Sequence, residues 1–186
     1  CSTGTFLDIA KNAGWKTFGL ELNKKELAVG RAKGHFIKEE MINTANFDEK
    51  FCAITLWDVF EHIKDGLQFL NDSKRLLREG GVVFMQIPSS DSLAAKIMKS
   101  ACNMFDGLEH VNLYGLEGFT ILARRAGYEI VSYETVISEI GFINNYLSYH
   151  DPYLGPTKNR RTIANLISED QIFEQNLGYK IQTCLR

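Results

Sequence analysis

The chain has 186 residues, of which 45% are hydrophobic and 24% charged, a composition typical of one globular domain with a sizeable core. Its formal net charge of −2 at pH 7 argues against a protein that holds nucleic acid on a basic surface. No apolar run reaches the roughly 20 residues of a membrane span, and no signal peptide is visible. The four cysteines form no CxxC pair, so we expect reduced thiols, no metal site and a cytoplasmic location.

Helices and strands alternate in the pattern of the first residues. Apolar residues at helical spacing over residues 5–12, followed by Gly14, predict a first helix, and residues 15–21 are typical of a short strand. A second helix is expected between Asn23, as its N-cap, and Gly34, as its stop.

The middle of the chain repeats this alternation. Residues 36–37 predict a weak strand, and the continuous apolar run at residues 51–57 predicts a strand buried on both faces. An amphipathic helix is expected over residues 65–81, ended by two glycines, before another buried strand at residues 82–88.

The last part departs from the alternation. A helix over residues 115–127 and a strand over residues 128–136 are followed by a long polar excursion, residues 137–176, and by a strand over residues 178–186. Strands separated by helices predict a mostly parallel sheet, that is, an α/β fold. We expect the late strand to be antiparallel and to insert beside the strand at residues 128–136.

The opening segment Cys-Ser-Thr-Gly has the chemistry of a ligand-binding turn. Glycine and small residues let the backbone approach a ligand closely, and the following helix N-terminus offers N–H groups to an anion. An acidic residue about 20 positions on, here Glu21, is placed to bind ribose hydroxyls in such folds. On these residues alone, an ordinary loop and a solvated strand end explain the pattern equally well.

Three further segments strengthen the first interpretation: FDEKFCAITLWDVFEHIKD, LLREGGVVFMQIPSS and EHVNLYGLEGFTILARRAGYEIV. In this order they resemble the class I S-adenosylmethionine-dependent methyltransferases, in particular those that act on small molecules, over nearly all of residues 1–135. Residues 1–4 match the end of that family's first loop, with Ser2 where a glycine is common. The resemblance implies a Rossmann-like, doubly wound, mostly parallel sheet with a final antiparallel strand, and a first strand missing from this chain.

The resemblance also implies how S-adenosylmethionine would bind. Glu21 would hold the ribose hydroxyls through charge-assisted hydrogen bonds. The other cofactor-binding residues that it implies are Cys1, Ser2, Thr3, Gly4, Leu22, Asn23, Asn46 (with Asn43 as the alternative), Trp57 and Asp58. For Trp57 and Asp58, a buried aromatic side chain and a helix N-cap are the competing interpretations.

The candidate catalytic bases are histidines. His110 follows the strand at residues 82–88 on the side where the family's acceptor enters, and a histidine there suits a general base. His62 belongs to a family signature in which it often has a structural role, and fixing a loop is also an alternative for His110. We expect His35 to be solvated in a surface turn, whereas His150 lies in the excursion.

The sequence therefore predicts an enzyme that transfers a methyl group to a small-molecule acceptor, with O-methylation favoured and neither nucleic acid nor membrane as a partner. Residues 137–176 would form a lid and acceptor site within a single methyltransferase domain, residues 1–186. A non-catalytic S-adenosylmethionine-binding module or partner subunit is the alternative. A nicotinamide-dependent oxidoreductase ranks lower, because Gly4 is not followed by the glycines of a dinucleotide fingerprint. The oligomeric state stays open.

Overall fold

The computed structural model of the chain describes residues 1–105, 107–136 and 180–186. The proposed lid at residues 137–176, including His150, lies outside the described residues. The chain divides into two compact units, the first from Cys1 to Lys50 and the second from Phe51 to Arg186, and each is described by itself.

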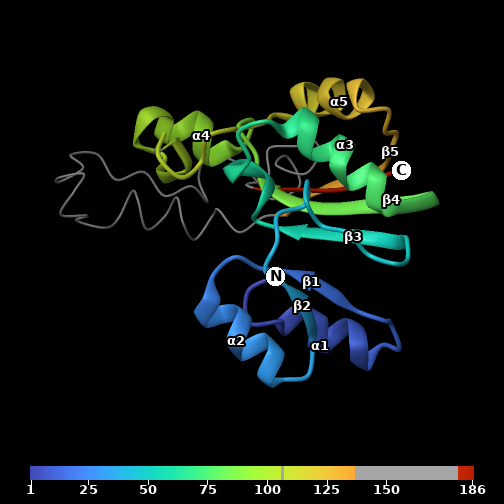
Figure 1. Cartoon of the computed structure of the whole chain (residues 1–186). Coiled ribbons are helices and arrows are strands. Elements are labelled where there is room, and N and C mark those ends of the chain that lie inside the picture. Colours follow the sequence, from blue (N-terminus) through green and yellow to red (C-terminus); the bar gives the residue numbers. More distant parts are fainter. Residues whose placement is uncertain (106, 137–179) are drawn as a thin grey trace. The chain divides into compact units, whose positions relative to one another are not determined.

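The first unit is a small βαβ arrangement preceded by a helix (Figure 1). Its elements are α1 (Thr5–Asn12), β1 (Phe18–Leu20), α2 (Lys24–Ala32) and β2 (Phe36–Lys38). The two strands are parallel, and Leu7, Leu27 and Ile37 form an apolar cluster that joins α1, α2 and β2. Asn23 caps α2 as predicted, because its Oδ1 accepts a hydrogen bond from the Lys25 N–H at 3.0 Å.

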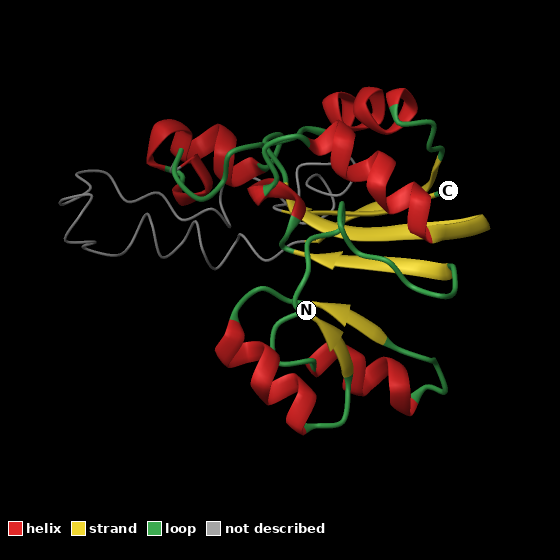
Figure 2. Cartoon of the chain, in the orientation of Figure 1, coloured by secondary structure: helices red, strands yellow, loops and turns green. Residues whose placement is uncertain are grey.

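The second unit contains a four-stranded sheet in the order β3-β4-β6-β5 (Figure 2). Its elements are β3 (Phe51–Trp57), η1 (Phe60–His62), α3 (Gly66–Leu76), β4 (Leu77–Pro88), α4 (Leu93–Met98), η2 (Lys99–Ala101), η3 (Asn103–Phe105), α5 (Leu116–Arg125), β5 (Ile130–Val136) and β6 (Lys180–Leu185). Strand β6 inserts between β4 and β5 and is antiparallel to both. The predicted α/β fold and its late antiparallel strand are therefore confirmed.

The core of the second unit lies between its sheet and the helices α3 and α5, which run side by side on one face of the sheet (Figure 1). Phe60 and Phe119 are completely buried and meet edge to face, with ring centroids 5.9 Å apart. The hydroxyl of buried Tyr128 donates a hydrogen bond to the Leu70 carbonyl at 3.2 Å, so its polar atom is satisfied inside the core.

The predicted helix over residues 65–81 is too long. Helix α3 ends at Leu76, and Leu77 already pairs with Phe51 as the first residue of β4. The pairing then shifts, so that Ala53 lies opposite Val82 and residues 78–81 bulge from the ladder. Gly80 has a φ of 71°, and a Cβ on Gly81 would lie 2.9 Å from the Arg78 carbonyl oxygen. The two glycines therefore form a bulge and do not cap the helix.

The short helices η1, α4, η2 and η3 were not predicted.

Two strand predictions also need correction. Strand β1 spans three residues of the predicted seven. Strand β3 is not buried on both faces, since only Leu56 is buried. In the described residues, β3 is an edge strand of its sheet, which accounts for its exposure. Strand β4 carries the buried pattern instead, with Val83, Met85 and Ile87 inside.

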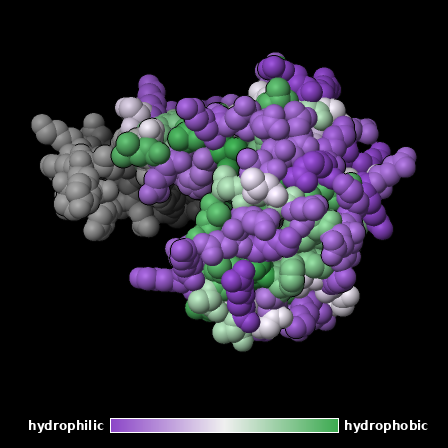
Figure 3. All heavy atoms as spheres, in the orientation of Figure 1, coloured by the Kyte–Doolittle hydropathy of each residue, from purple (hydrophilic) through white to green (hydrophobic). Residues whose placement is uncertain are grey.

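The described surface mixes polar and apolar side chains, and polar ones cover most of the face shown in Figure 3. Within the described ranges, no helix combines the length and the apolar character needed to cross a membrane.

Candidate functional site

The predicted ligand turn at residues 1–4 is a tight turn that leads into α1. Gly4 caps the helix with a φ of 79°, and its N–H donates to the Cys1 carbonyl at 3.1 Å. A Cβ at this position would lie 2.7 Å from Cδ2 of His35. Glycine is thus required twice, by the left-handed backbone and by the close approach of the imidazole.

His35 is not solvated, contrary to the sequence prediction. It is 6% exposed, and its Nε2 lies 2.8 Å from Oδ1 of Asp8, whose Oδ2 accepts from Lys33 Nζ at 3.0 Å. The hydrogen bonds from Lys33 and His35 lower the pKa of Asp8. The His35 ring therefore packs against Gly4 and is held there by a hydrogen bond to Asp8, 27 residues earlier in the chain.

Glu21 lies just after β1 and joins the strand end to the ligand turn. Its Oε2 accepts from the Cys1 amino group at 2.9 Å and from the Ser2 N–H at 2.6 Å, and its Oε1 accepts from the N–H groups of Leu22 and Asn23 at 2.9 and 2.8 Å. Burial acts to raise the pKa of Glu21, but these hydrogen bonds outweigh it and lower the pKa to about 2. The carboxylate is therefore ionised and fully engaged by donors.

The remaining predicted residues of the first unit lie at its surface. Leu22 is 54% exposed, and Asn23 uses its side-chain oxygen to cap α2. Asn43 and Asn46 are both exposed, and the backbone carbonyl of Asn46 accepts a hydrogen bond from the Lys38 amine. Asn43 and Asn46 therefore both stay candidates for the adenine pocket.

In the second unit, Trp57 is the last residue of β3 and Asp58 follows it. Trp57 is 39% exposed and packs on Phe84 with ring centroids 5.0 Å apart, so the alternative of a buried aromatic side chain is wrong. Asp58 has a φ of 51°, and its side chain lies 3.4 Å from the Gln86 amide nitrogen. The N-cap of η1 is Val59, so Asp58 is not the predicted helix cap.

The two candidate bases come together with a residue that the sequence analysis did not select. Glu61, His62 and His110 each offer one ligand atom, and these atoms all lie within 4.8 Å of one another. The imidazole rings of His62 and His110 have centroids 5.1 Å apart, and His62 Nε2 lies 4.0 Å from Oε1 of Glu61. We call these three residues the Glu61 cluster.

Backbone contacts hold the Glu61 cluster together. The Glu61 carbonyl accepts from the N–H groups of Val111 and Asn112, both at 3.0 Å, and the Asn112 amide donates to the carbonyls of Ile63 and Lys64. These bonds attach the segment that carries His110 to the segment that carries His62. They explain how two residues 48 positions apart become neighbours.

Glu61 is the most unusual charged group of the cluster. It is 2% exposed, and none of the described residues hydrogen-bonds to its Oε2. Burial raises the pKa of Glu61, the nearby Asp58 raises it further, and His62 and His110 oppose the shift. The sequence shows that a glutamate precedes His62. It does not show that this glutamate is buried, because the burial depends on tertiary contacts.

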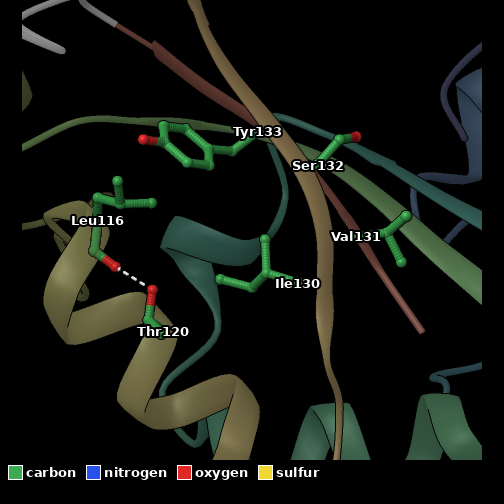
Figure 4. A pocket seen from close by; sticks show the side chains of 6 residues that line it. All are labelled: Leu116, Thr120, Ile130, Val131, Ser132 and Tyr133. Atoms are coloured by element: carbon green, nitrogen blue, oxygen red, sulfur yellow. Dashed lines mark hydrogen bonds between the residues drawn. The ribbon is translucent and has the colours of Figure 1, made fainter.

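A hollow lies elsewhere in the second unit, between α5 and β5 (Figure 4). Leu116, Ile130 and Tyr133 line it with Thr120, Val131 and Ser132, and it has a volume of about 480 Å³. No predicted site residue lines this hollow.

Comparisons with known proteins agree with this geometry. A family model described as a methyltransferase domain matches residues 1–133. A search of curated protein sequences finds no match.

Solved structures share the fold. An S-adenosylmethionine-dependent methyltransferase from Mesorhizobium loti is 14% identical with a TM-score of 0.65, covering 100% of this chain and 87% of that one. A SAM-dependent methyltransferase from Archaeoglobus fulgidus is 15% identical with a TM-score of 0.67, covering 100% and 82%. The plantazolicin methyltransferase, solved with a triazolic substrate analogue and SAH, is 13% identical with a TM-score of 0.62, covering 100% and 73%.

Proposed function

Because this chain belongs to the methyltransferase domain family, we propose that it transfers the methyl group of S-adenosylmethionine to an oxygen atom of a small-molecule acceptor. One observation carries the proposal: the glycine turn and the acidic strand end lie in direct contact, with the Ser2 nitrogen 2.6 Å from Oε2 of Glu21. A helix N-terminus and a carboxylate side by side suit a ligand that has a carboxylate at one end and ribose hydroxyls near the other.

In this proposal the turn at residues 1–4 holds the amino-acid part of the cofactor and Glu21 holds the ribose. A carboxylate has about four acceptor positions, and four donors already approach Glu21. Ribose hydroxyls therefore replace the donors from Cys1 and Ser2, and the turn moves when the cofactor binds. Leu22 and Asn23 flank the adenosine, with Asn46 or Asn43 at the adenine. The family resemblance assigns Trp57 and Asp58 to the methionine part.

Methyl transfer mainly requires that the protein align the acceptor oxygen with the methyl group of the cofactor. The acceptor oxygen attacks the methyl carbon in line with the carbon–sulfur bond, that bond breaks, and S-adenosylhomocysteine leaves with a neutral sulfur. A hydroxyl acceptor must also lose its proton. His62 and His110 are the groups that promote this loss, because both carry their Nδ1 proton toward a carbonyl, of Glu109 and Met104 respectively, and so have the lone pair on Nε2.

The net charge and one structural neighbour support the choice of acceptor class. The net charge of −2 offers no attraction to a nucleic-acid backbone, and the plantazolicin methyltransferase was solved with a triazolic analogue. We therefore favour a small organic acceptor over a macromolecule. None of the four cysteines forms a disulfide, which fits a reaction in the cytoplasm.

A methyl-transfer assay with labelled S-adenosylmethionine tests the proposal against the non-catalytic alternative. Titration calorimetry first measures cofactor binding, and a panel of hydroxylated small molecules is then offered as acceptor. His110→Gln should lower kcat at least tenfold while the cofactor dissociation constant stays unchanged. Cofactor binding without transfer to any acceptor would support a binding module, and no cofactor binding at all would refute the proposal.

A further inference from the structure

We propose that the Glu61 cluster binds a divalent transition-metal ion such as Mn²⁺, Fe²⁺, Co²⁺ or Zn²⁺. Its three ligand atoms, all within 4.8 Å of one another, come from one carboxylate and two imidazoles of the second unit. This donor set is one that proteins use for such ions. The proposal departs from the sequence prediction, which found no CxxC pair and no histidine at ligand spacing from the cysteines and expected no metal site.

The first argument is the burial of Glu61. Its side chain is 2% exposed, and Oε2 has no hydrogen-bond partner among the described residues. A buried acceptor without a partner is costly, so such groups are uncommon in folded proteins unless something satisfies them. The backbone of Glu61 is fixed by two N–H groups that its carbonyl accepts, so the carboxylate does not simply turn out to solvent. A cation beside the two imidazoles supplies the missing partner.

The second argument is the orientation of the histidines. His62 Nδ1 lies 2.7 Å from the Glu109 carbonyl oxygen, and His110 Nδ1 lies 3.1 Å from the Met104 carbonyl oxygen. A carbonyl oxygen only accepts, so each Nδ1 carries a proton, and in the neutral imidazole Nε2 then carries the lone pair. This is the arrangement in which metal-binding histidines are held, with the outer nitrogen donating to a backbone carbonyl and the inner one facing the ion.

The third argument is distance. Two ligand atoms about 2.0–2.2 Å from one ion lie roughly 3.3–3.6 Å from each other in a tetrahedral site. The 4.0 Å between His62 Nε2 and Glu61 Oε1 is close to this range. The widest separation, up to 4.8 Å, must close by about 1 Å when the ion binds. The His62 side chain is 41% exposed, so it has room to make that adjustment.

The ligand types decide the class of ion. Mg²⁺ and Ca²⁺ prefer oxygen ligands, whereas imidazole suits the first-row transition metals. Three protein ligands leave coordination positions open, as in catalytic sites. Water fills them, or an oxygen of the acceptor does, which rests on the proposed function. An ion there lowers the pKa of a bound hydroxyl, so the histidines would promote proton loss as ligands and the proton would pass to solvent.

Mn²⁺ binding followed by electron paramagnetic resonance tests the proposal on tag-free, chelator-treated protein. Mn²⁺ is the probe because thiolates such as exposed Cys1 bind it weakly. We expect one saturable site, at least tenfold weaker in Glu61→Gln and in His110→Gln. Glu117→Gln is the matched control, since this exposed glutamate of α5 lies outside the cluster and should leave affinity unchanged.

Two results would overturn the inference: no saturable Mn²⁺ site in the folded protein, or equal affinity in wild type, Glu61→Gln and His110→Gln. Equal affinity for Mg²⁺ and Mn²⁺ would overturn the class of ion. His62→Gln alters an exposed side chain, so it should weaken Mn²⁺ binding even if Glu61→Gln does not fold. Cofactor titration of the chelator-treated protein separates the two proposals, because cofactor binding without a Mn²⁺ site refutes only the metal and a Mn²⁺ site without cofactor binding refutes only the proposed function.

Discussion

Two glutamates, one in each unit, have opposite environments. Glu21 accepts four hydrogen bonds from N–H donors, and its pKa falls to about 2. Glu61 is almost completely buried, one of its oxygens has no partner in the described part of the chain, and burial raises its pKa. The hydrogen-bonding capacity of the Glu21 carboxylate is filled by N–H groups of the chain. The Glu61 carboxylate is held in place by the fold, but one of its oxygens has no hydrogen-bond partner among the described residues.

The two glutamates differ in what a ligand must do in order to bind. A ligand of Glu21 has to displace existing hydrogen bonds, so binding there couples to movement of the turn at residues 1–4. A ligand of Glu61 displaces nothing that the structure describes and relieves an existing cost. We therefore expect changes at Glu21 to weaken both folding and binding, and changes at Glu61 to weaken function while folding improves.

The largest expected effect is that of Gly4→Ala. A left-handed backbone costs an L-residue about 1–2 kcal/mol, and forcing a Cβ to 2.7 Å from the His35 ring adds about 1–3 kcal/mol. Denaturant unfolding should show a loss of roughly 2–5 kcal/mol, together with weaker cofactor binding.

Gly14→Ala is the matched control, because Gly14 has a φ of 89° but no atom within 4 Å of its would-be Cβ. It carries the backbone strain without the clash, so it should cost about 1–2 kcal/mol. Equal losses for the two variants would show that the contact between Gly4 and His35 carries no energy.

Glu21→Gln should lower cofactor affinity at least tenfold, about 1.4 kcal/mol, in a calorimetric titration. The amide nitrogen of glutamine would point a donor at donors, and charge-assisted hydrogen bonds to ribose would be lost. Glu39→Gln serves as the control, since Glu39 is exposed and its ion pair with Lys24 is long, at 3.8 Å. An unchanged dissociation constant in folded Glu21→Gln would exclude Glu21 from the cofactor site.

Sequence patterns predicted most of the fold, because the spacing of apolar residues indicates a helix or a strand even where the exact ends of the element differ. The alternation of helices and strands and the late strand β6 follow from it, whereas the cap at Asn23 follows from the residue type at that position. The end of α3 did not, because a glycine pair is equally typical of a helix stop and of a bulge. Only the pairing of Leu77 with Phe51 distinguishes the two.

The candidate site was less predictable. The burial of His35 depends on Asp8, and that of Glu61 depends on the packing of η1, so neither follows from its own neighbourhood in the sequence. The sequence did select His62 and His110 separately. Their proximity depends on tertiary structure, because backbone hydrogen bonds between residue 61 and residues 111–112 bring the two segments together.

Glu61→Met tests the other half of the comparison. Replacing a buried, incompletely paired carboxyl by an apolar side chain of similar length should stabilise the protein by about 1 kcal/mol. Denaturant unfolding should show a higher midpoint, while methyl transfer should fall. The control is Glu117→Met, an exposed position of α5 at which we expect a change within about 0.5 kcal/mol. A loss of stability in Glu61→Met would show that the fold depends on the carboxylate.

The smallest effect is the acid sensitivity of Glu21. Its folded pKa of about 2 lies below the ordinary value of 4.5, so its stabilising contribution is complete above pH 4.5 and is lost as the pH falls toward 2. Asp8, whose pKa is lowered by the hydrogen bonds of Lys33 and His35, acts in the same direction. Urea midpoints should therefore change little through Glu21 between pH 7 and 5 and decline below pH 4.5, with a shallower decline in Glu21→Gln. A Glu21 carboxyl carbon that titrates near 4.5 in an NMR experiment would mean that the four N–H donors do not hold the carboxylate in solution, and Glu21 would then resemble an exposed glutamate that a ribose could reach without moving the turn.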